Sequence, residues 1–142
     1  TMTTKLMDYF NRSPRIGIMS TADKSGHVDS GIFGSTRMTD EKTVVMGLSN
    51  NRTLANLQQN PKAVYMIIEP GTTLTDWKGI RVYMVALQIA TSGQDLELFK
   101  NQIAEVVGRE AANMMMALVT FEVTEVRPIV DMGQGWEESI QQ

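Results

Sequence analysis

Apolar and polar residues alternate along six separate stretches of the chain, which is the spacing of β-strands with one buried face. We therefore predict six strands, at residues 15–21, 27–38, 44–48, 63–68, 80–91 and 118–126. Most are joined by short polar turns, and the glycine-containing turn at residues 23–26 predicts a hairpin. The alternation slips phase near Val85, which predicts a bulge in the fifth strand.

The second predicted strand is interrupted by Gly31 and Gly34. Its alternation places Val28, Ile32 and Met38 on one face. Glycine inside a strand often marks a bulge, or a place where a ligand or another backbone comes close.

Helical spacing appears between these strands. Residues 5–10 predict a short helix that ends at Ser13-Pro14, and residues 52–59 predict a helix that ends at Asn60-Pro61. Residues 95–107 carry one apolar stripe and are followed by Gly108, which is typical of a helix with a glycine after its last turn. Residues 109–116 add another turn or two.

The element order predicts a mainly β fold of the α+β class, in one domain over residues 1–142. A parallel α/β sheet would need a crossover helix between successive strands, and only two strand pairs have one. Antiparallel hairpins of this kind close most easily into a small barrel.

The start of the helix at residues 52–59 is a candidate anion site. Asn50 and Asn51 are both good N-cap residues, and Arg52 and Thr53 follow in the first turn. An arginine has the wrong charge for this end of the helix dipole, so an anion such as a phosphate would complement it. The alternative is an exposed arginine after an ordinary cap.

Composition removes several classes of function. The 142 residues include no cysteine and one histidine, His27, which excludes disulfides, thiolate chemistry and His-rich metal sites. The net charge is −3 and the 13 basic residues are scattered, so we expect no nucleic-acid partner. The chain has no apolar run of the ~20 residues that a membrane span needs, and no signal peptide, so we expect a cytoplasmic protein. The 11 methionines suggest adaptable packing in a core or interface.

Phosphate-loop and dinucleotide-binding glycine motifs are missing from the sequence. His27 and Asp29 would share a strand face, but no serine or cysteine is placed as a nucleophile beside them, so a solvated histidine is the better interpretation. Trp77 and Trp136 are the two tryptophans, and an interface role is expected for both.

Three segments, at residues 40–48, 51–57 and 60–64, carry a resemblance to a known family. They read Asp-Glu-Lys-Thr-Val-Val-Met-Gly-Leu, Asn-Arg-Thr-Leu-Ala-Asn-Leu and Asn-Pro-Lys-Ala-Val. This pattern resembles the centre of the pyridoxamine 5′-phosphate oxidase-like proteins, which bind flavin mononucleotide (FMN) in a split β-barrel. The similarity extends from about residue 5 to residue 127 in the order of strands and helices.

The resemblance implies a six-stranded antiparallel split barrel, a homodimer, and a set of FMN contacts. Those contacts would be Asn51, Arg52 and Thr53 at the phosphate, Gly34, Ser35, Thr36 and Arg37 along the isoalloxazine and ribityl chain, Met46, Gly47 and Leu48 beside the ring, and Trp77. Gly34 and Gly47 would leave room for the flavin. Trp77 would either reach a flavin held mainly by the other subunit or serve as an interface anchor.

Two departures from the family pattern limit what the resemblance implies. Ile32 stands where better-equipped oxidases have an arginine that helps to hold the phosphate, so phosphate affinity would depend more on Arg52. Residues 129–136 replace the arginine- and histidine-containing segment that grips pyridoxal phosphate. Oxidation of pyridoxamine phosphate itself is therefore not expected.

Three hypotheses remain. The chain is a homodimeric flavoprotein enzyme that moves a hydride or electrons between FMN and a small molecule, or it binds flavin for electron transfer or storage without a substrate pocket. An open face over the reactive ring edge would favour the enzyme. A third hypothesis keeps the fold with a deazaflavin or haem, and haem is disfavoured because His27 is the one conventional nitrogen ligand and lies in a hairpin.

Overall fold

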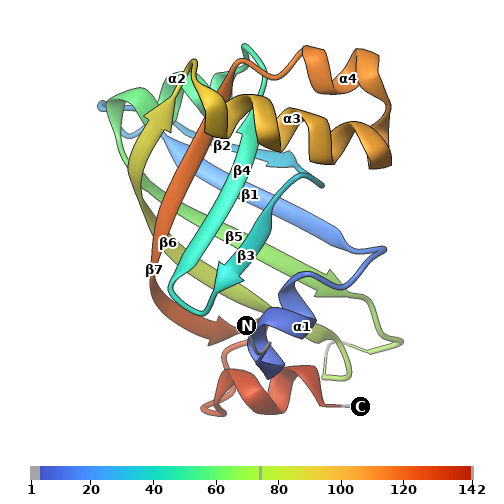
Figure 1. Ribbon diagram of the computed structural model, residues 1–142. Helices are drawn as coiled ribbons and strands as arrows, with labels where there is room; N and C mark the ends of the chain where they lie inside the picture. Colours follow the sequence, from blue (N-terminus) through green and yellow to red (C-terminus); the bar gives the residue numbers. More distant parts are fainter. Residues whose placement is uncertain (1–3, 74, 142) are drawn as a thin grey trace.

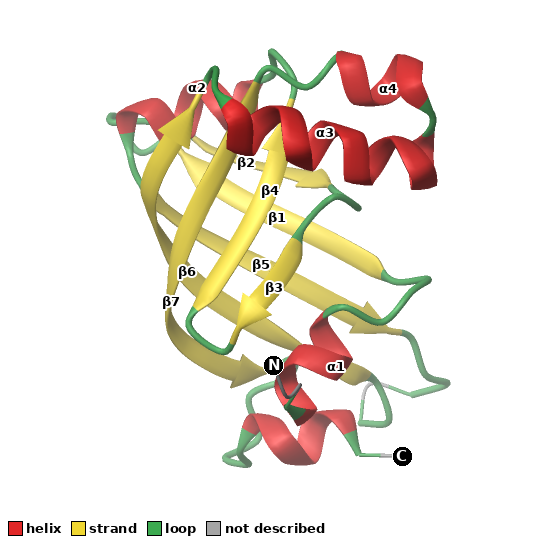
Figure 2. Cartoon of the chain, viewed as in Figure 1, coloured by secondary structure: helices red, strands yellow, loops and turns green. Residues whose placement is uncertain are grey.

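Seven antiparallel strands form one sheet that curls into an open barrel, in the order β2-β1-β5-β6-β7-β4-β3 (Figures 1 and 2). The computed structural model describes residues 4–73 and 75–141. The strands are β1 (Ile16–Ala22), β2 (Val28–Ile32), β3 (Arg37–Asp40), β4 (Thr43–Leu48), β5 (Lys62–Glu69), β6 (Lys78–Ala90) and β7 (Ala117–Pro128). The mainly β class predicted from the sequence is confirmed, with seven strands in place of six.

The additional strand arises because the stretch predicted as one strand, residues 27–38, is two strands at opposite edges of the sheet. Residues 33–36 carry the chain across the opening between β2 and β3. The expected common face is therefore wrong: Val28 and Ile32 are exposed, whereas Met38 is buried. An irregular crossing resets the two-residue alternation, so positions before and after it do not share a face.

Local sequence signals set the helices. α1 (Lys5–Phe10) buries Leu6, Tyr9 and Phe10, as its spacing predicts. α2 (Arg52–Gln59) has the predicted bounds, and the Asn51 side chain accepts a hydrogen bond from the Leu54 amide at 2.9 Å. The cap is therefore Asn51, with Asn50 exposed before it.

The remaining helices lie at the two ends of the barrel. α3 (Gln94–Val107) and α4 (Arg109–Asn113) cover the end that also holds α2, and the 3₁₀ helix η1 (Trp136–Ile140), which the sequence did not predict, lies near α1 at the other end (Figure 1). Val106 and Val107, which end the predicted apolar stripe of residues 95–107, are exposed. None of the described helices has the length and apolar character needed to cross a bilayer.

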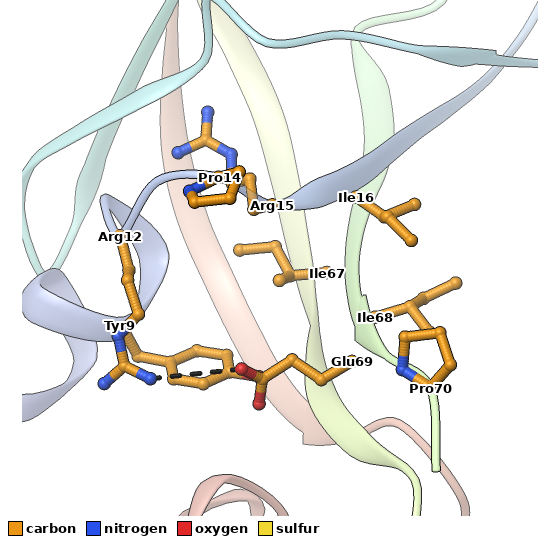
Figure 3. Close-up of a pocket in the computed structure, with 9 residues that line it drawn as sticks. All are labelled: Tyr9, Arg12, Pro14, Arg15, Ile16, Ile67, Ile68, Glu69 and Pro70. Carbon is orange, nitrogen blue, oxygen red and sulfur yellow. Dashed lines mark hydrogen bonds and ion pairs between the residues drawn. The ribbon is translucent and has the colours of Figure 1, made fainter. Parts of the chain in front are cut away.

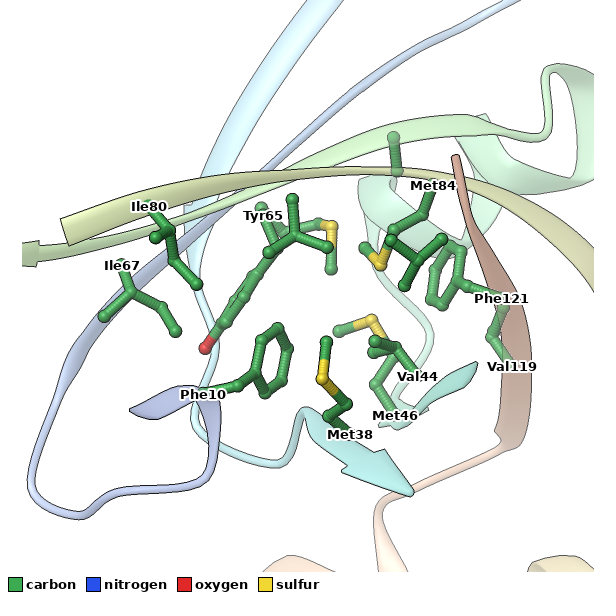
Figure 4. Close-up of a cluster of buried hydrophobic side chains, with 14 of the residues drawn as sticks. Phe10, Met38, Val44, Met46, Tyr65, Ile67, Ile80, Met84, Val119 and Phe121 are labelled. Atoms are coloured by element: carbon green, nitrogen blue, oxygen red, sulfur yellow. The ribbon is translucent and has the colours of Figure 1, made fainter. Parts of the chain in front are cut away.

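The main core fills the barrel (Figure 4). Its fully buried side chains include Tyr65, Phe10, Phe121, Met19, Met38, Met46, Ile80, Val82 and Val119. Trp136, for which we expected an interface role, packs against this core within its own chain. A smaller cluster of Leu96, Phe99 and Leu118 joins α3 to the outer side of the sheet. The predicted bulge in β6 is confirmed by register shifts at residues 83–84 and 86–88 against β7.

Candidate functional site

The start of α2 presents an exposed arginine beside a capped helix end. β4 delivers the chain to this point, and Asn51 closes the first turn through its side-chain oxygen. Arg52 is exposed, whereas Thr53 is only 3% exposed. The Arg52 side chain is thus open to an anion from solvent, whereas Thr53 is buried.

The crossing segment 33–36 runs beside β4. Ser35 Oγ donates a hydrogen bond to the Gly47 carbonyl oxygen at 3.0 Å, and Arg37 pairs with Val45 across the β3–β4 ladder. The structure therefore brings together two of the groups of residues that the resemblance assigned to the flavin, residues 34–37 and 46–48.

Two positions in the crossing segment have features that suit a ligand. Gly34 is exposed, and a Cβ added there would meet no atom within 4 Å, so the space beside its backbone is open. The Thr36 hydroxyl is buried and finds no hydrogen-bond partner among the described residues. A buried polar group without a partner is uncommon in folded proteins, and a bound water or ligand atom is a usual explanation.

The β4 residues do not present an open surface for a flavin ring. Met46 and Leu48 point into the core. A Cβ on Gly47 would lie 2.4 Å from Met115 Sδ and 2.9 Å from the Phe99 ring. The room that we expected this glycine to leave for the flavin is occupied by these two side chains, because β4 alternates and its outer face is covered by α3 and the segment after α4.

A polar cluster that the sequence analysis missed lies beneath the crossing segment. The Arg15 guanidinium donates hydrogen bonds to the carbonyl oxygens of Phe10 at 2.7 Å, Gly34 at 3.3 Å and Thr36. The Tyr65 hydroxyl donates to the Phe33 carbonyl oxygen at 2.6 Å and accepts from Arg15 Nε at 3.2 Å. The available signal was Tyr65 at an inward position of β5, where a buried hydroxyl requires a partner.

Arg15 also borders a cavity of about 330 Å³ between α1 and the end of β5 (Figure 3). Its wall combines Ile67 and Ile68 with Glu69, which accepts a hydrogen bond from the Tyr9 hydroxyl at 2.9 Å. Burial raises the pKa of Tyr9 above its ordinary value, and the hydrogen bond and negative charge of Glu69 add to this. Tyr9 therefore remains protonated and serves as a donor.

Trp77 lies away from the other predicted contacts within one chain. It precedes β6, which starts at the end of the barrel opposite α2 (Figure 1), and it is 38% exposed. It borders a cavity of about 210 Å³ with Ile129, Val130 and Met132. Its contact with a flavin held by another subunit stays a prediction.

His27 is a solvated residue of the β1–β2 hairpin, as predicted. Its side chain is 82% exposed and its Nδ1 lies 3.0 Å from Asp23 Oδ2. The hydrogen bond from the His27 backbone N–H lowers the pKa of Asp23. Within residues 4–73 and 75–141, no three histidine, aspartate or glutamate side chains gather in a way that could hold a metal ion.

Residues 3–129 match the sequence model of the family described as pyridoxamine 5′-phosphate oxidase. The chain belongs to the pyridoxamine 5′-phosphate oxidase family. The resemblance drawn from residues 40–64 is thus confirmed. No sequence among the curated proteins matches this chain.

Solved structures agree on the fold of this member of the pyridoxamine 5′-phosphate oxidase family. An FMN-binding protein from Syntrophomonas wolfei subsp. wolfei is 20% identical, with a TM-score of 0.76 over 89% of this chain and 84% of that one. HutZ, the heme storage protein from Vibrio cholerae, is 18% identical, with a TM-score of 0.64 over 88% of this chain and 94% of that one. An F420 reductase is 11% identical, with a TM-score of 0.64 over 87% and 98%. At these identities the likeness shows the split-barrel fold.

Proposed function

We propose that this pyridoxamine 5′-phosphate oxidase family member binds FMN and works, as a homodimer, as an oxidoreductase on a small molecule. The observation that carries the proposal is the exposed Arg52 at the start of the capped helix α2, at the end of the strand that borders the crossing segment. A helix start with an adjacent guanidinium is a favourable place for a phosphate.

The proposed roles follow from what each residue presents. Arg52, Asn51 and the first amides of α2 would hold the phosphate. Gly34 would let the ligand approach the backbone, and the buried Thr36 hydroxyl is a polar group with no hydrogen-bond partner among residues 4–73 and 75–141. FMN supplies the hydride or electron transfer when it is bound, and the protein orients it and excludes competing reactions.

The filled space beside Gly47 limits where the flavin ring could lie. Because Met115 and Phe99 fill the space on its outer side, we place the flavin ring toward Gly34 and Arg37 rather than against Gly47. Any contact of the flavin with residues 46–48 is then limited to the backbone of these residues, because the Met46 and Leu48 side chains lie in the core.

Homodimerisation is proposed because the ring would otherwise be covered from one side only. Ile16, Val28 and Ile32 are exposed apolar residues on β1 and β2, at one edge of the opening. Trp77 is a further exposed aromatic side chain that a second subunit could cover. Light scattering should give a dimer at micromolar concentration, and a monomer would remove the shared site.

The test of the proposed cofactor is a titration with FMN, riboflavin, F420 and haem, followed by absorption and fluorescence. FMN should bind more tightly than riboflavin, which lacks the phosphate. Arg52→Ala should weaken FMN binding by about 1.5–3 kcal/mol, the range for a hydrogen bond to a charged group, or roughly 10- to 150-fold, and leave riboflavin binding unchanged.

Arg109→Ala is the matched control, because Arg109 is also the exposed first residue of a helix, α4. It should bind FMN like the parent protein. If Arg52→Ala also binds FMN like the parent protein, the assignment of Arg52 to the phosphate is wrong. If the parent protein binds haem or F420 more tightly than FMN, FMN is not the cofactor. Reduction of bound FMN by a small-molecule donor faster than free FMN would support the enzyme over a storage or electron-transfer role.

A further inference from the structure

The crossing segment 33–36 is the part of the barrel wall that bridges the opening, and its carbonyl groups accept hydrogen bonds from two side chains, Arg15 and Tyr65. Gly34 and Thr36 both offer their carbonyl oxygens to Arg15, and Phe33 offers its carbonyl oxygen to the Tyr65 hydroxyl. The segment lies between the two edge strands β2 and β3, and these two side chains bind three of its four carbonyl oxygens, those of Phe33, Gly34 and Thr36.

Arginine is suited to this task by its shape. The planar guanidinium has five N–H donors in a fixed arrangement, and the structure uses them on three carbonyl oxygens and one hydroxyl. The group also lies 5.5 Å from the ring centroid of Phe10 and 5.6 Å from that of Tyr65, which is the range of cation–π contacts. A lysine could reach fewer of these acceptors at once.

The same segment is where the flavin would lie. Gly34 is exposed with open space beside it, although its carbonyl oxygen is within hydrogen-bond distance of Arg15. The hydrogen bond from Arg15 to the Gly34 carbonyl oxygen therefore sets the position of the exposed Gly34 backbone that a ligand would contact. A shift of the Gly34–Thr36 backbone would also move the Ser35 hydroxyl away from the Gly47 carbonyl oxygen.

We propose that Arg15 is a positioning residue for flavin binding: through its hydrogen bonds to the Gly34 and Thr36 carbonyl oxygens, it fixes the backbone of residues 34–36 in the conformation that the flavin requires. The inference rests on the proposed function, because this segment is a flavin contact only if FMN binds there. Arg15 itself would not touch the flavin.

The test compares Arg15→Met with Arg12→Met, using FMN titration and hydrogen exchange of residues 33–38 in the flavin-free protein. Arg12 is a matched control, since it borders the same cavity and carries the same charge but contacts Glu69, at 4.0 Å, and the Tyr9 ring. Arg15→Met should weaken FMN binding about tenfold or more and speed exchange in residues 33–38, whereas Arg12→Met should change neither.

Arg15→Lys separates geometry from charge. It should resemble Arg15→Met in FMN affinity, because the charge remains but the fixed arrangement of donors is lost. Full restoration of affinity by lysine would overturn the inference. If Arg15→Met does not fold, Tyr65→Phe removes the hydroxyl that holds Phe33 and keeps the ring in the core, and it should give the same two changes to a smaller degree.

The outcomes distinguish this inference from the proposed function. A parent protein that binds no FMN refutes the proposed function, and the flavin part of this inference with it, whatever the exchange data show. A parent that binds FMN, with an Arg15→Met variant that binds equally well, overturns the positioning role alone. Faster exchange with unchanged affinity also overturns it, because the segment would then be held for the fold and not for the flavin.

Discussion

Gly17 is a position where a very small substitution should have a large effect on stability. It lies in β1 directly beneath the Tyr65 side chain, and a Cβ added there would be 1.9 Å from Tyr65 Oη and 2.4 Å from Tyr65 Cζ. The Tyr65 ring is fully buried, so it cannot turn away into solvent. Gly17→Ala must therefore displace the ring or the strand.

The magnitude follows from three contributions. Overpacking of a core costs about 1–3 kcal/mol, and a displaced ring would break the bond from the Tyr65 hydroxyl to Phe33, leaving a buried polar group without its partner at about 1–3 kcal/mol. The lower chain entropy of alanine in the unfolded state returns about 0.4–1 kcal/mol. Together these contributions should lower the free energy of unfolding by about 1–5 kcal/mol, with a central value of about 3 kcal/mol.

Urea denaturation measures this change. At a slope of about 2 kcal/mol/M, the middle of the range for small proteins, a loss of about 3 kcal/mol should lower the midpoint by about 1.5 M with little change in slope. Gly34→Ala is the matched control, because a Cβ there meets nothing within 4 Å, and its midpoint should stay near that of the parent. In a Tyr65→Phe background the atom nearest to the new Cβ is gone, so Gly17→Ala should cost less. A Gly17→Ala protein with the parent's midpoint would refute the packing described for Tyr65.

Two further predictions concern helix capping and a surface loop. Asn51→Ala should lower the free energy of unfolding by about 1 kcal/mol through loss of the α2 cap, measured by urea denaturation, while Asn50→Ala should change it by less than about 0.5 kcal/mol. Hydrogen bonds from Thr72 and Thr73 lower the pKa of Asp76 to about 2. The contribution of this carboxylate to stability should thus be complete above about pH 4 and be lost as the pH falls through about 2; an NMR titration of Asp76 with an ordinary pKa would contradict the loop geometry.

Helix α2 shows how far local signals reach. Its bounds, residues 52–59, were predicted because Asn50 and Asn51 are both good N-cap residues and Pro61 disfavours helix at Asn60; the structure shows that Asn51 is the cap. Both effects involve residues only a few positions apart. The β1–β2 hairpin was predicted for the same reason, from the polar turn at residues 23–26.

The split between β2 and β3 shows where local signals end. The alternating pattern continues through residues 27–38, yet the chain leaves one edge of the sheet after β2 and joins the other edge at β3. Which strands form the two edges depends on pairing with strands far away in the sequence, so residues 27–38 alone do not show it. The Arg15–Tyr65 pair was missed for a similar reason: the two residues are 50 positions apart. The family pattern indicated two parts of the candidate site, the start of α2 and the crossing segment. It did not indicate Arg15 and Tyr65, which hold the crossing segment, or Met115 and Phe99, which cover Gly47.

The sequence alone determined the strand alternation, the helix ends, the family and the chemical character of the candidate site, because these depend on residue types within a few positions. Tertiary structure decided which side of each glycine is open. Gly34 faces free space, whereas the space beside Gly47 holds Met115 and Phe99, which come from elements some 50 to 70 positions later in the chain. Packing depends on side chains that folding brings together from distant positions, so the same residue type can adjoin a vacancy at one site and a filled interior at another.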